Sequence, residues 1–151
     1  MTDPSPTRVL VTGAGGPAGV AVIRSLLRRD GVTVLAADMD RYASGLYLVE
    51  PGARHLVEPG LSETFVDSLL ALCERERVDV LFSTVDVELP RVAADRKRFD
   101  ALGTVLAAPT LETLEVSLDK YALAQRCAAV VPVPRTELLG AGDPASWDFP
   151  V

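Results

Sequence analysis

Apolar and polar positions follow two different periods along the chain up to residue 109. Residues 8–12 (RVLVT) and 32–37 (VTVLAA) are short runs rich in β-branched and apolar side chains, typical of strands covered on both faces. Between them, apolar side chains recur at helical spacing over residues 18–29, and Gly31 follows as the expected C-cap residue. The chain therefore begins with a predicted strand, helix and strand.

The rest of this pattern predicts further strands at residues 53–57, 78–83 and 104–107, and further helices at residues 62–77 and 90–102. Ser62 suits the N-cap of the first of these helices, and Pro90 suits the first turn of the second. Parallel strands need helical crossovers, and such connections are right-handed, so the alternation predicts a doubly wound α/β fold. We expect a mostly parallel, five-stranded, Rossmann-like sheet with helices on both faces.

The pattern changes after residue 109. Residues 110–116 and 117–128 predict two short helices, and residues 131–135 (VPVPR) must be extended because each proline restricts its own backbone and that of its predecessor. We therefore expect a Rossmann-like domain over residues 1–109 and a helical and extended linker, leading into a further domain, over residues 110–151. The apolar ending WDFPV is unlike the polar ends of most chains, so we expect that further chain follows Val151.

Composition and charge exclude several classes of function. With 21 acidic and 15 basic residues the net charge is −6, and the basic residues are scattered, so nucleic acid is not an expected partner. There is no basic, apolar leader and no apolar run of the roughly 18 residues that a membrane span needs, so we expect a cytoplasmic protein that does not enter a membrane. Cys73 and Cys127 lie in apolar helical contexts and are expected to be reduced core thiols, with no metal site.

A glycine-rich turn, GAGGPAG, joins the first predicted strand to the first predicted helix. It places Gly13, Gly15, Gly16 and Gly19 where backbone amides at a helix start can face an anion or a carboxylate. Asp38 ends the second strand, the position of the acid that takes ribose hydroxyls in dinucleotide-binding domains. The alternative is a tight turn that needs glycine only for packing, and the sequence leaves both open.

Polar residues also follow the fourth strand, in the segment TVDVELP at residues 84–90. Ligands of open α/β sheets bind beyond the carboxyl ends of the strands, so Thr84, Asp86 and Glu88 are candidate ligand-binding residues beside the glycine turn. Asp86 and Glu88 could instead cap the helix that begins near Pro90, where acids favour the positive end of the dipole. The two roles are compatible.

Lys120 stands next to Asp119 at the start of a predicted short helix. An acid there is ordinary capping, but a lysine in the first turn opposes the helix dipole by a few tenths of a kcal/mol. A phosphate partner would account for this placement, and the alternative is a solvated lysine.

Five segments, in this order and spacing, resemble the N-terminal pre-ATP-grasp domain and linker of carbamoyl-phosphate-synthase-like ATP-grasp ligases. The pair Asp119-Lys120, followed a dozen residues later by the proline-rich strap, is more specific than the glycine turn. The resemblance covers nearly the whole chain. The segments are residues 9–19 (VLVTGAGGPAG), 36–48 (AADMDRYASGLYL), 84–89 (TVDVEL), 118–122 (LDKYA) and 131–136 (VPVPRT).

The resemblance implies a function for the longer protein. Lys120 would reach the ATP phosphates, while the glycine turn and the acids after the fourth strand would face the acceptor-substrate side. ATP and Mg²⁺ would serve the complete enzyme in joining a carboxylate to an amine through an acylphosphate. The family's remaining phosphate and magnesium residues lie beyond the position of Val151, so this chain is expected to bind neither tightly, to contain no catalytic residue and to be inactive alone. The substrates are not identified, and a homo-oligomer stays open.

Two other classes of function remain as alternatives. VTGAGGPAG also resembles the opening of nicotinamide-dependent short-chain dehydrogenases and epimerases, but none of the three tyrosines has a lysine four residues later, as the catalytic pair of those enzymes requires. A non-catalytic nucleotide-binding module is the other alternative. His55, the single histidine, has no acid or serine beside it, so we predict no catalytic role for it.

Overall fold

The computed structural model describes residues 5–138 and 140. The chain divides into two compact units, Met1–Leu111 and Glu112–Val151, which are treated separately below.

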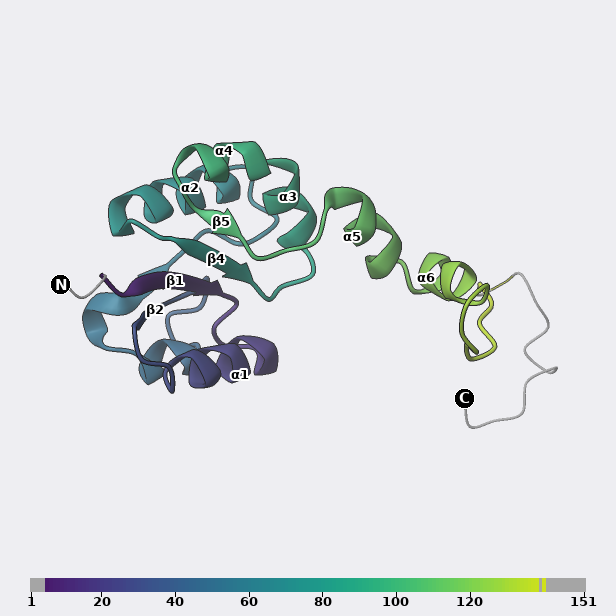
Figure 1. Cartoon of the computed structure of the whole chain (residues 1–151), viewed down its shortest axis with the longest axis horizontal. Coiled ribbons are helices and arrows are strands. Elements are labelled where there is room, and N and C mark those ends of the chain that lie inside the picture. Colours follow the sequence, from purple (N-terminus) through teal and green to yellow (C-terminus); the bar gives the residue numbers. More distant parts are fainter. Residues whose placement is uncertain (1–4, 139, 141–151) are drawn as a thin grey trace. The chain divides into compact units, whose positions relative to one another are not determined.

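The first unit is built on a five-stranded sheet in the order β3-β2-β1-β4-β5, and every pair of neighbours is parallel (Figure 1). The strands are β1 (Thr7–Thr12), β2 (Val32–Asp38), β3 (Arg54–Leu56), β4 (Val80–Ser83) and β5 (Val105–Leu106). Central β1 pairs with β2 on one side and β4 on the other, so that Val9 stands opposite both Val34 and Val80. The predicted five-stranded, Rossmann-like sheet is confirmed.

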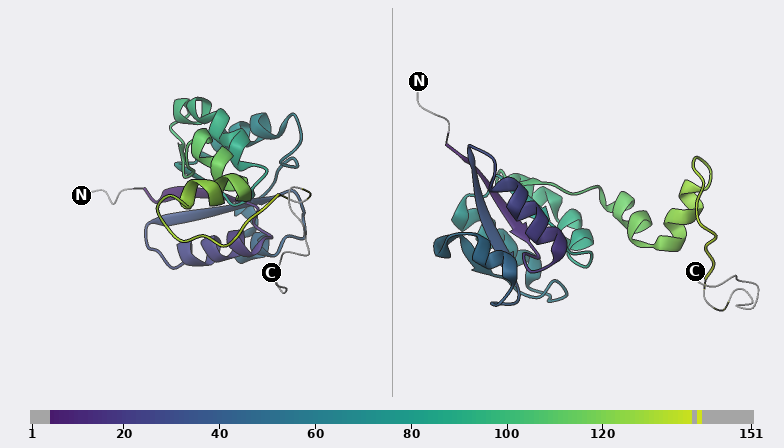
Figure 2. Two further views of the ribbon diagram at one scale, coloured as in Figure 1. Left: turned by 90° about the vertical axis from the view of Figure 1, so that its right-hand side faces the viewer. Right: turned by 90° about the horizontal axis from the view of Figure 1, so that it is seen from below.

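Helices cover both faces of this sheet, as Figure 2 shows edge-on: α1 lies on one face and α2 to α4 on the other. Two 3₁₀ helices, η1 and η2, form the crossover from β2 to β3 in place of a longer α-helix. The doubly wound arrangement is therefore as predicted. The helices are α1 (Pro17–Leu26), η1 (Ser44–Leu48), η2 (Pro51–Ala53), α2 (Phe65–Glu76), α3 (Leu89–Ala94) and α4 (Arg96–Ala101).

The strands are apolar on both faces because each face builds its own core. In β1, Leu10 packs on the side of α2 with Phe65, Leu69 and Phe99, all fully buried. Its neighbours Val9 and Val11 point to the other face, where Ile23 of α1 and Leu46 of η1 complete a second core. Burial on both faces explains why these strands show continuous apolar runs and no alternation.

Three predicted helix boundaries are wrong, each for a local reason. Ser62 does not cap a helix. It lies in a turn in which its Oγ is 2.9 Å from Thr64 Oγ1, and α2 begins only at Phe65. The helix expected at residues 90–102 breaks at Asp95, where φ is −96° and ψ is 14°, into α3 and α4. Gly31, with φ of +73°, turns the chain into β2, whereas α1 already ends at a C-cap on Leu27.

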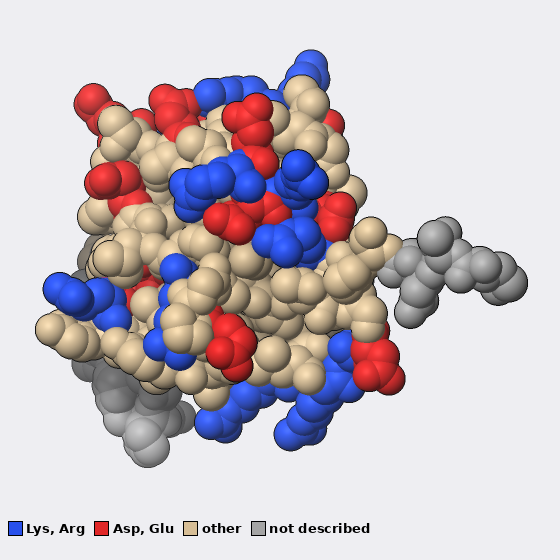
Figure 3. Space-filling view, turned by 90° about the vertical axis from the view of Figure 1, so that its left-hand side faces the viewer, with Lys and Arg blue, Asp and Glu red and all other residues tan. Residues whose placement is uncertain are grey.

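The face that carries the amino ends of the strands shows acidic and basic side chains interspersed (Figure 3). At this end Arg8 pairs with Glu76 at 3.3 Å, and its backbone amide donates to Asp79 at 2.7 Å. The described residues of this face therefore form no large patch of a single charge.

The second unit contains α6 (Lys120–Cys127), which is preceded by α5 (Leu111–Leu118). The boundary between the two falls at Asp119, two residues later than Ser117, where the second helix was expected to begin. Asp119 caps α6, and the proline strap forms neither helix nor strand up to residue 138. The apolar ending WDFPV lies outside the described residues.

The two cysteines are free, but only one is a core thiol. Cys73 is buried in α2, and burial raises the pKa of its thiol to about 12, which leaves it unreactive. Cys127 is half-buried at the end of α6, so its assignment to a core was wrong: the two short helices bury too little surface to cover it. Within the described part of the chain, no helix is long and apolar enough to cross a membrane.

Candidate functional site

A cavity of about 540 Å³ opens beyond the carboxyl ends of β1, β2 and β4, the place where open α/β sheets bind ligands. The loops that follow these strands supply most of its wall, and the loop before α2 adds Gly60. The lining residues are Gly13, Gly16, Pro17, Ala18, Asp38, Met39, Gly60, Thr84, Val85, Asp86, Val87 and Glu88. The structure thus brings together six of the eight residues that the sequence singled out for substrate binding.

Gly15 and Gly19 are the two that do not line the cavity, and packing accounts for both. A Cβ on Gly19 would lie 2.1 Å from the carbonyl oxygen of Gly13, so α1 can approach the turn only because this residue has no side chain. A Cβ on Gly15 would lie 2.9 Å from that of Ala43. Gly13 has φ of +67° and contacts Val85 closely, whereas Gly16 has ordinary space around it. Close packing therefore explains most of the glycines.

Asp38 holds the glycine turn in place. Its Oδ2 accepts from the amide of Gly15 at 2.8 Å, and its Oδ1 accepts from the amide of Asp40 at 3.0 Å. The amides of Ala14 and Gly16 are also taken, by carbonyls of β2 and of the turn. A dinucleotide needs free turn amides for its pyrophosphate and a free acid for its ribose. Here the acid and the amides bind each other, which disfavours the dehydrogenase alternative.

Glu88 is the most buried acid of the cavity, with 6% of its surface exposed. Its Oε2 accepts hydrogen bonds from Thr12 Oγ1 at 2.5 Å and Ser83 Oγ at 2.8 Å, at the ends of β1 and β4. Burial raises the pKa of the Glu88 carboxyl, the two hydroxyls oppose that rise, and the nearby charge of Asp38 adds to it. Although Glu88 occupies the N-cap position of α3, its side chain makes no capping bond, so capping does not explain its presence.

The other two polar residues of this loop behave differently. Thr84 donates to the carbonyl oxygen of Thr12 at 2.8 Å and so ties the β4 loop to the end of β1. Asp86 is exposed, and it does not occupy the N-cap position of α3. Its carboxylate is therefore available to a ligand in the cavity.

The charge of the cavity is negative. Asp38, Asp86 and Glu88 line it, and none of its described lining residues is a lysine or an arginine. Arg91 is close by, but it donates to the carbonyl oxygen of Gly60 and stacks on the ring of Phe65. No group of His, Cys, Asp or Glu among the described residues is arranged to hold a metal ion. The three acids of the cavity favour a cation over an anion.

Gly60 is a lining residue that the sequence analysis missed. A Cβ on Gly60 would lie 2.8 Å from Cγ of Glu88, so the lack of a side chain lets this loop approach Glu88 closely. The signal was present in the sequence, since Pro59-Gly60 is a turn dipeptide shortly after the third strand, at the same edge of the sheet.

Lys120 lies in the second unit. Asp119 Oδ1 accepts from the amides of Tyr121 and Ala122 at 2.9 and 3.0 Å, which is N-capping. Lys120 Nζ donates to the carbonyl oxygen of Ser117 at 3.1 Å, in the last turn of α5. This bond places the ammonium at the negative end of the α5 dipole, which offsets its unfavourable position at the start of α6.

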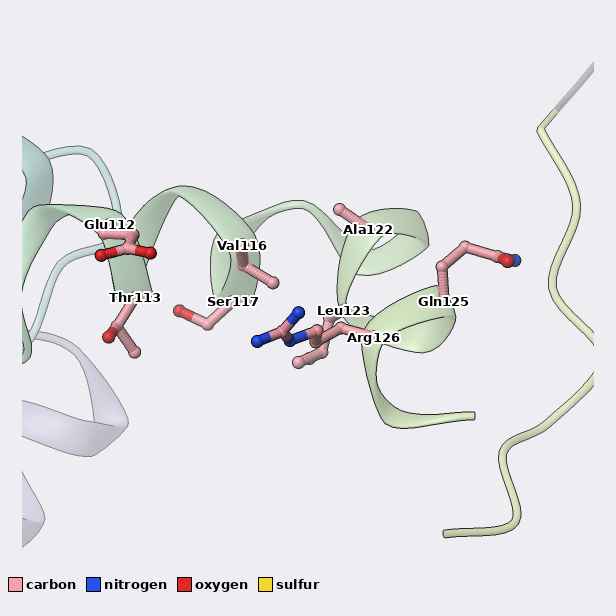
Figure 4. Close-up of a pocket in the computed structure, with 8 residues that line it drawn as sticks. All are labelled: Glu112, Thr113, Val116, Ser117, Ala122, Leu123, Gln125 and Arg126. Atoms are coloured by element: carbon pink, nitrogen blue, oxygen red, sulfur yellow. The ribbon is translucent and has the colours of Figure 1, made fainter. Parts of the chain in front are cut away.

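A second cavity, of about 820 Å³, lies between α5 and α6, and Figure 4 shows Arg126 extending between the two helices toward Ser117. Lys120 is not among its lining residues, so the lysine and this cavity are separate features. The lining residues are Glu112, Thr113, Val116, Ser117, Ala122, Leu123, Gln125 and Arg126.

Comparison with solved structures identifies proteins that share this fold. The chain is similar to the biotin carboxylase domain of a single-chain bacterial carboxylase, with 15% identity and a TM-score of 0.57 over 82% of this chain and 29% of that one. It is also similar to a complete multifunctional pyruvate carboxylase from Rhizobium etli, with 17% identity and a TM-score of 0.55 over 87% of this chain and 13% of that one. At these identities the likeness shows the fold, and this chain spans less than a third of either protein. Taken together with the family model described next, the fold is that of the pre-ATP-grasp domain of ATP-grasp ligases, as predicted.

A family model gives the more particular assignment. The model of the PylC-like N-terminal domain matches residues 9–107, which is well over half of the chain. The chain therefore belongs to the PylC-like N-terminal domain family. The matched segment contains the whole sheet core and every residue that lines the cavity at its carboxyl edge. No curated protein sequence matches the chain.

Proposed function

We propose that this domain supplies the substrate side of an ATP-grasp carboxylate–amine ligase of the carbamoyl-phosphate-synthase-like kind, and that its cavity binds the cationic amino group of a substrate. The observation that carries the proposal is the acid-lined cavity: three carboxylates and no basic residue line it, at the ligand-binding edge of the sheet. Family membership supplies the class of reaction, and the charge of the cavity selects the amine among the reactants.

Coulomb energies favour an amine over a phosphate in this cavity. Two unit charges 4 Å apart interact by about 4 kcal/mol at the effective dielectric of a protein surface. An ammonium between Asp38, Asp86 and Glu88 would gain such attraction, whereas an ATP phosphate would be repelled by the same groups. ATP must then be held elsewhere in the complete enzyme.

Before a ligand binds, the buried charge of Glu88 is energetically unfavourable. Burial disfavours its ionised form, and a cation in the cavity would restore that form by direct attraction. The hydroxyls of Thr12 and Ser83 fix the orientation of the carboxylate from the side of the sheet. The carboxylate is thus pre-oriented for an ammonium, and little side-chain freedom is lost on binding.

We propose Lys120 as the one residue of this chain directed at ATP. Its ammonium has a single weak tether, to the carbonyl oxygen of Ser117, and could exchange it for a phosphate oxygen. When bound, ATP would supply the phosphoryl group that converts the substrate carboxylate into an acylphosphate. The amine would then attack the acyl carbon and displace phosphate. The Mg²⁺ ligands and most phosphate contacts would come from chain beyond residue 151, so this chain alone is expected to be inactive.

The cavity assignment is tested with n-butylammonium as a cationic probe and acetate as its anionic counterpart, in NMR titrations at constant ionic strength. We expect n-butylammonium to shift the amide signals of residues 84–88 saturably and acetate to leave them unchanged. Asp86→Asn should weaken cation binding about fivefold, since it removes one exposed charge partner. The matched control is Asp100→Asn, an exposed acid on α4 outside the cavity. Acetate binding at residues 84–88, or equal affinities in the two variants, would refute an amine site.

The ATP assignment is tested separately, by Lys120→Ala in the complete ligase. We expect KM for ATP to rise roughly tenfold, because one charge-assisted phosphate contact is lost, with unchanged melting temperature and unchanged KM for the amine. Arg126→Ala is the control, a basic residue of the same helix that the family resemblance does not direct at ATP. Unchanged ATP kinetics in Lys120→Ala would remove this residue from the phosphate site.

A further inference from the structure

A third cavity, of about 170 Å³, has the opposite charge to the candidate site. It lies at the β3 edge of the sheet, and none of its lining residues is shared with the acid-lined cavity. Two arginines line it, and no acid is among its described lining residues. The lining residues are Arg41, Leu46, Tyr47, Arg54, His55 and Leu56.

Arg54 is held in a fixed position by two contacts. Its guanidinium lies over the ring of Tyr47, 4.9 Å from the centroid, and its Nε donates to the carbonyl oxygen of Val49 at 3.0 Å. The two terminal nitrogens make none of the hydrogen bonds or ion pairs found among the described residues. The outer edge of a guanidinium is the part that binds a carboxylate or a phosphate with two parallel hydrogen bonds.

Tyr47 connects Arg54 to the second arginine. Its hydroxyl donates to the backbone carbonyl oxygen of Arg41 at 3.1 Å, so the ring that supports Arg54 also fixes the loop that carries Arg41. The side chain of Arg41 lies over the ring of Tyr42 at 5.6 Å and has no acidic partner in the described part of the chain. Its neighbour Asp40 is engaged elsewhere, since Oδ1 accepts from the amide of Tyr42 at 2.9 Å.

These two arginines differ from the arginines of the first unit that form ion pairs. Arg8 and Arg98 form ion pairs with Glu76 and Asp67, at 3.3 and 2.6 Å. Arg41 and Arg54 are held instead by aromatic rings and a carbonyl, which fix a guanidinium without neutralising it. Unneutralised, pre-oriented guanidinium groups at a concave surface are the usual means of binding an oxyanion.

We propose that this cavity is a binding subsite for an oxyanion, a phosphate or carboxylate group, held by Arg54 and Arg41. Its volume is below the roughly 300 to 1,000 Å³ of sites that enclose a whole drug-sized ligand. The subsite therefore takes the anionic group of a ligand rather than an entire nucleotide. The proposal does not depend on the function of the acid-lined cavity, because the two share no residue.

The test is an NMR titration of the ¹⁵N-labelled chain with inorganic phosphate and, separately, with acetate, at constant ionic strength. We expect at least one of the two anions to shift the amide signals of Tyr47 and residues 54–56 saturably. Arg41→Gln should weaken that binding roughly tenfold. This variant should fold normally, since the Arg41 side chain makes no hydrogen bond or ion pair within the described part of the chain. Arg28→Gln, an exposed arginine at the end of α1, is the matched control and should bind like the wild type.

The variant Arg54→Lys is a second, independent test of the oxyanion subsite. It keeps the positive charge but loses the planar fork, so it should also weaken binding while far-UV circular dichroism stays that of the wild type. Saturable binding of phosphate alone identifies a phosphoryl group as the ligand, and binding of acetate identifies a carboxylate. The absence of saturable shifts with both anions would overturn the proposal, and so would equal affinities in Arg41→Gln and Arg28→Gln.

Discussion

Gly19→Ala is expected to destabilise the domain by roughly 3 kcal/mol or more, a large share of the stability of a domain of this size. The added Cβ would lie 2.1 Å from the carbonyl oxygen of Gly13, 2.9 Å from its carbonyl carbon and 3.0 Å from Cα of Ala14. All three are backbone atoms of the turn, so no side chain can rotate away. Either α1 moves off the sheet or the turn is distorted.

Gly16→Ala is the matched control in the same turn. Its Cβ would meet only the carbonyl oxygen of Gly13, at 3.5 Å, which is ordinary contact. Because Gly16 is the N-cap of α1 with φ of −75°, alanine meets no steric barrier there, and we expect only the loss of about 1 kcal/mol that alanine costs at an N-cap. Chemical denaturation of both variants measures the difference. If Gly19→Ala were as stable as Gly16→Ala, the packing explanation of Gly19 would be wrong.

Glu88→Gln, unlike Gly19→Ala, is expected to stabilise the domain at neutral pH, by about 1–2 kcal/mol. Glutamine keeps an oxygen that can accept from Thr12 and Ser83 and removes the buried charge. Burial raises the pKa of Glu88 in the folded state, so between the unfolded and folded pKa values the native protein binds more protons than the unfolded one. The contribution of Glu88 to stability therefore increases as the pH falls, and it is unfavourable at neutral pH.

The measurement is the free energy of unfolding of both proteins at pH 5 and pH 8. The advantage of Glu88→Gln over the wild type should be larger at pH 8 and shrink at pH 5, because the wild-type carboxyl is then closer to its neutral form. Other titrating groups cancel in this difference. Glu58→Gln, at an exposed position, should show no such pH-dependent gain. The same Glu88→Gln protein should bind n-butylammonium about tenfold more weakly.

A gain of stability combined with a loss of binding is the signature of a residue retained for function at a cost to the fold. If Glu88→Gln destabilised the domain at pH 8, Glu88 would instead be a structural acid stabilised by its two hydroxyl partners. If it stabilised the domain without affecting cation binding, the amine site would not include Glu88.

The sequence by itself determined the fold class and the edge of the sheet that carries the site. Continuous apolar runs separated by amphipathic stretches permit few arrangements, and the two cores on either side of β1 are the direct result of those runs. The positions of Asp38, Thr84, Asp86 and Glu88 directly after their strands place them at one edge, because the strands are parallel. Local order along the chain was enough for both conclusions.

The tertiary structure alone decided what each of these residues does. Glu88 and Thr12 are 76 residues apart, and Asp38 and Gly15 are 23 apart, so neither hydrogen bond follows from local spacing. The sequence left open whether Glu88 caps a helix or binds a ligand, and whether the turn faces an anion or needs glycine only for packing. Both were decided by which partner lay closer in space, since a buried polar group must be satisfied by whatever the fold brings to it.

Two helix boundaries and the basic cavity also could not be predicted from the sequence. The break at Asp95 and the late start of α2 at Phe65 lie in local turn geometry, for which helix propensities are only a weak guide. The pairing of Arg54 with Tyr47 depends on how η1 folds back against β3. The sequence determined which elements form and that helices cover both faces of the sheet, whereas contacts between distant residues determined the charge, shape and chemistry of the cavities.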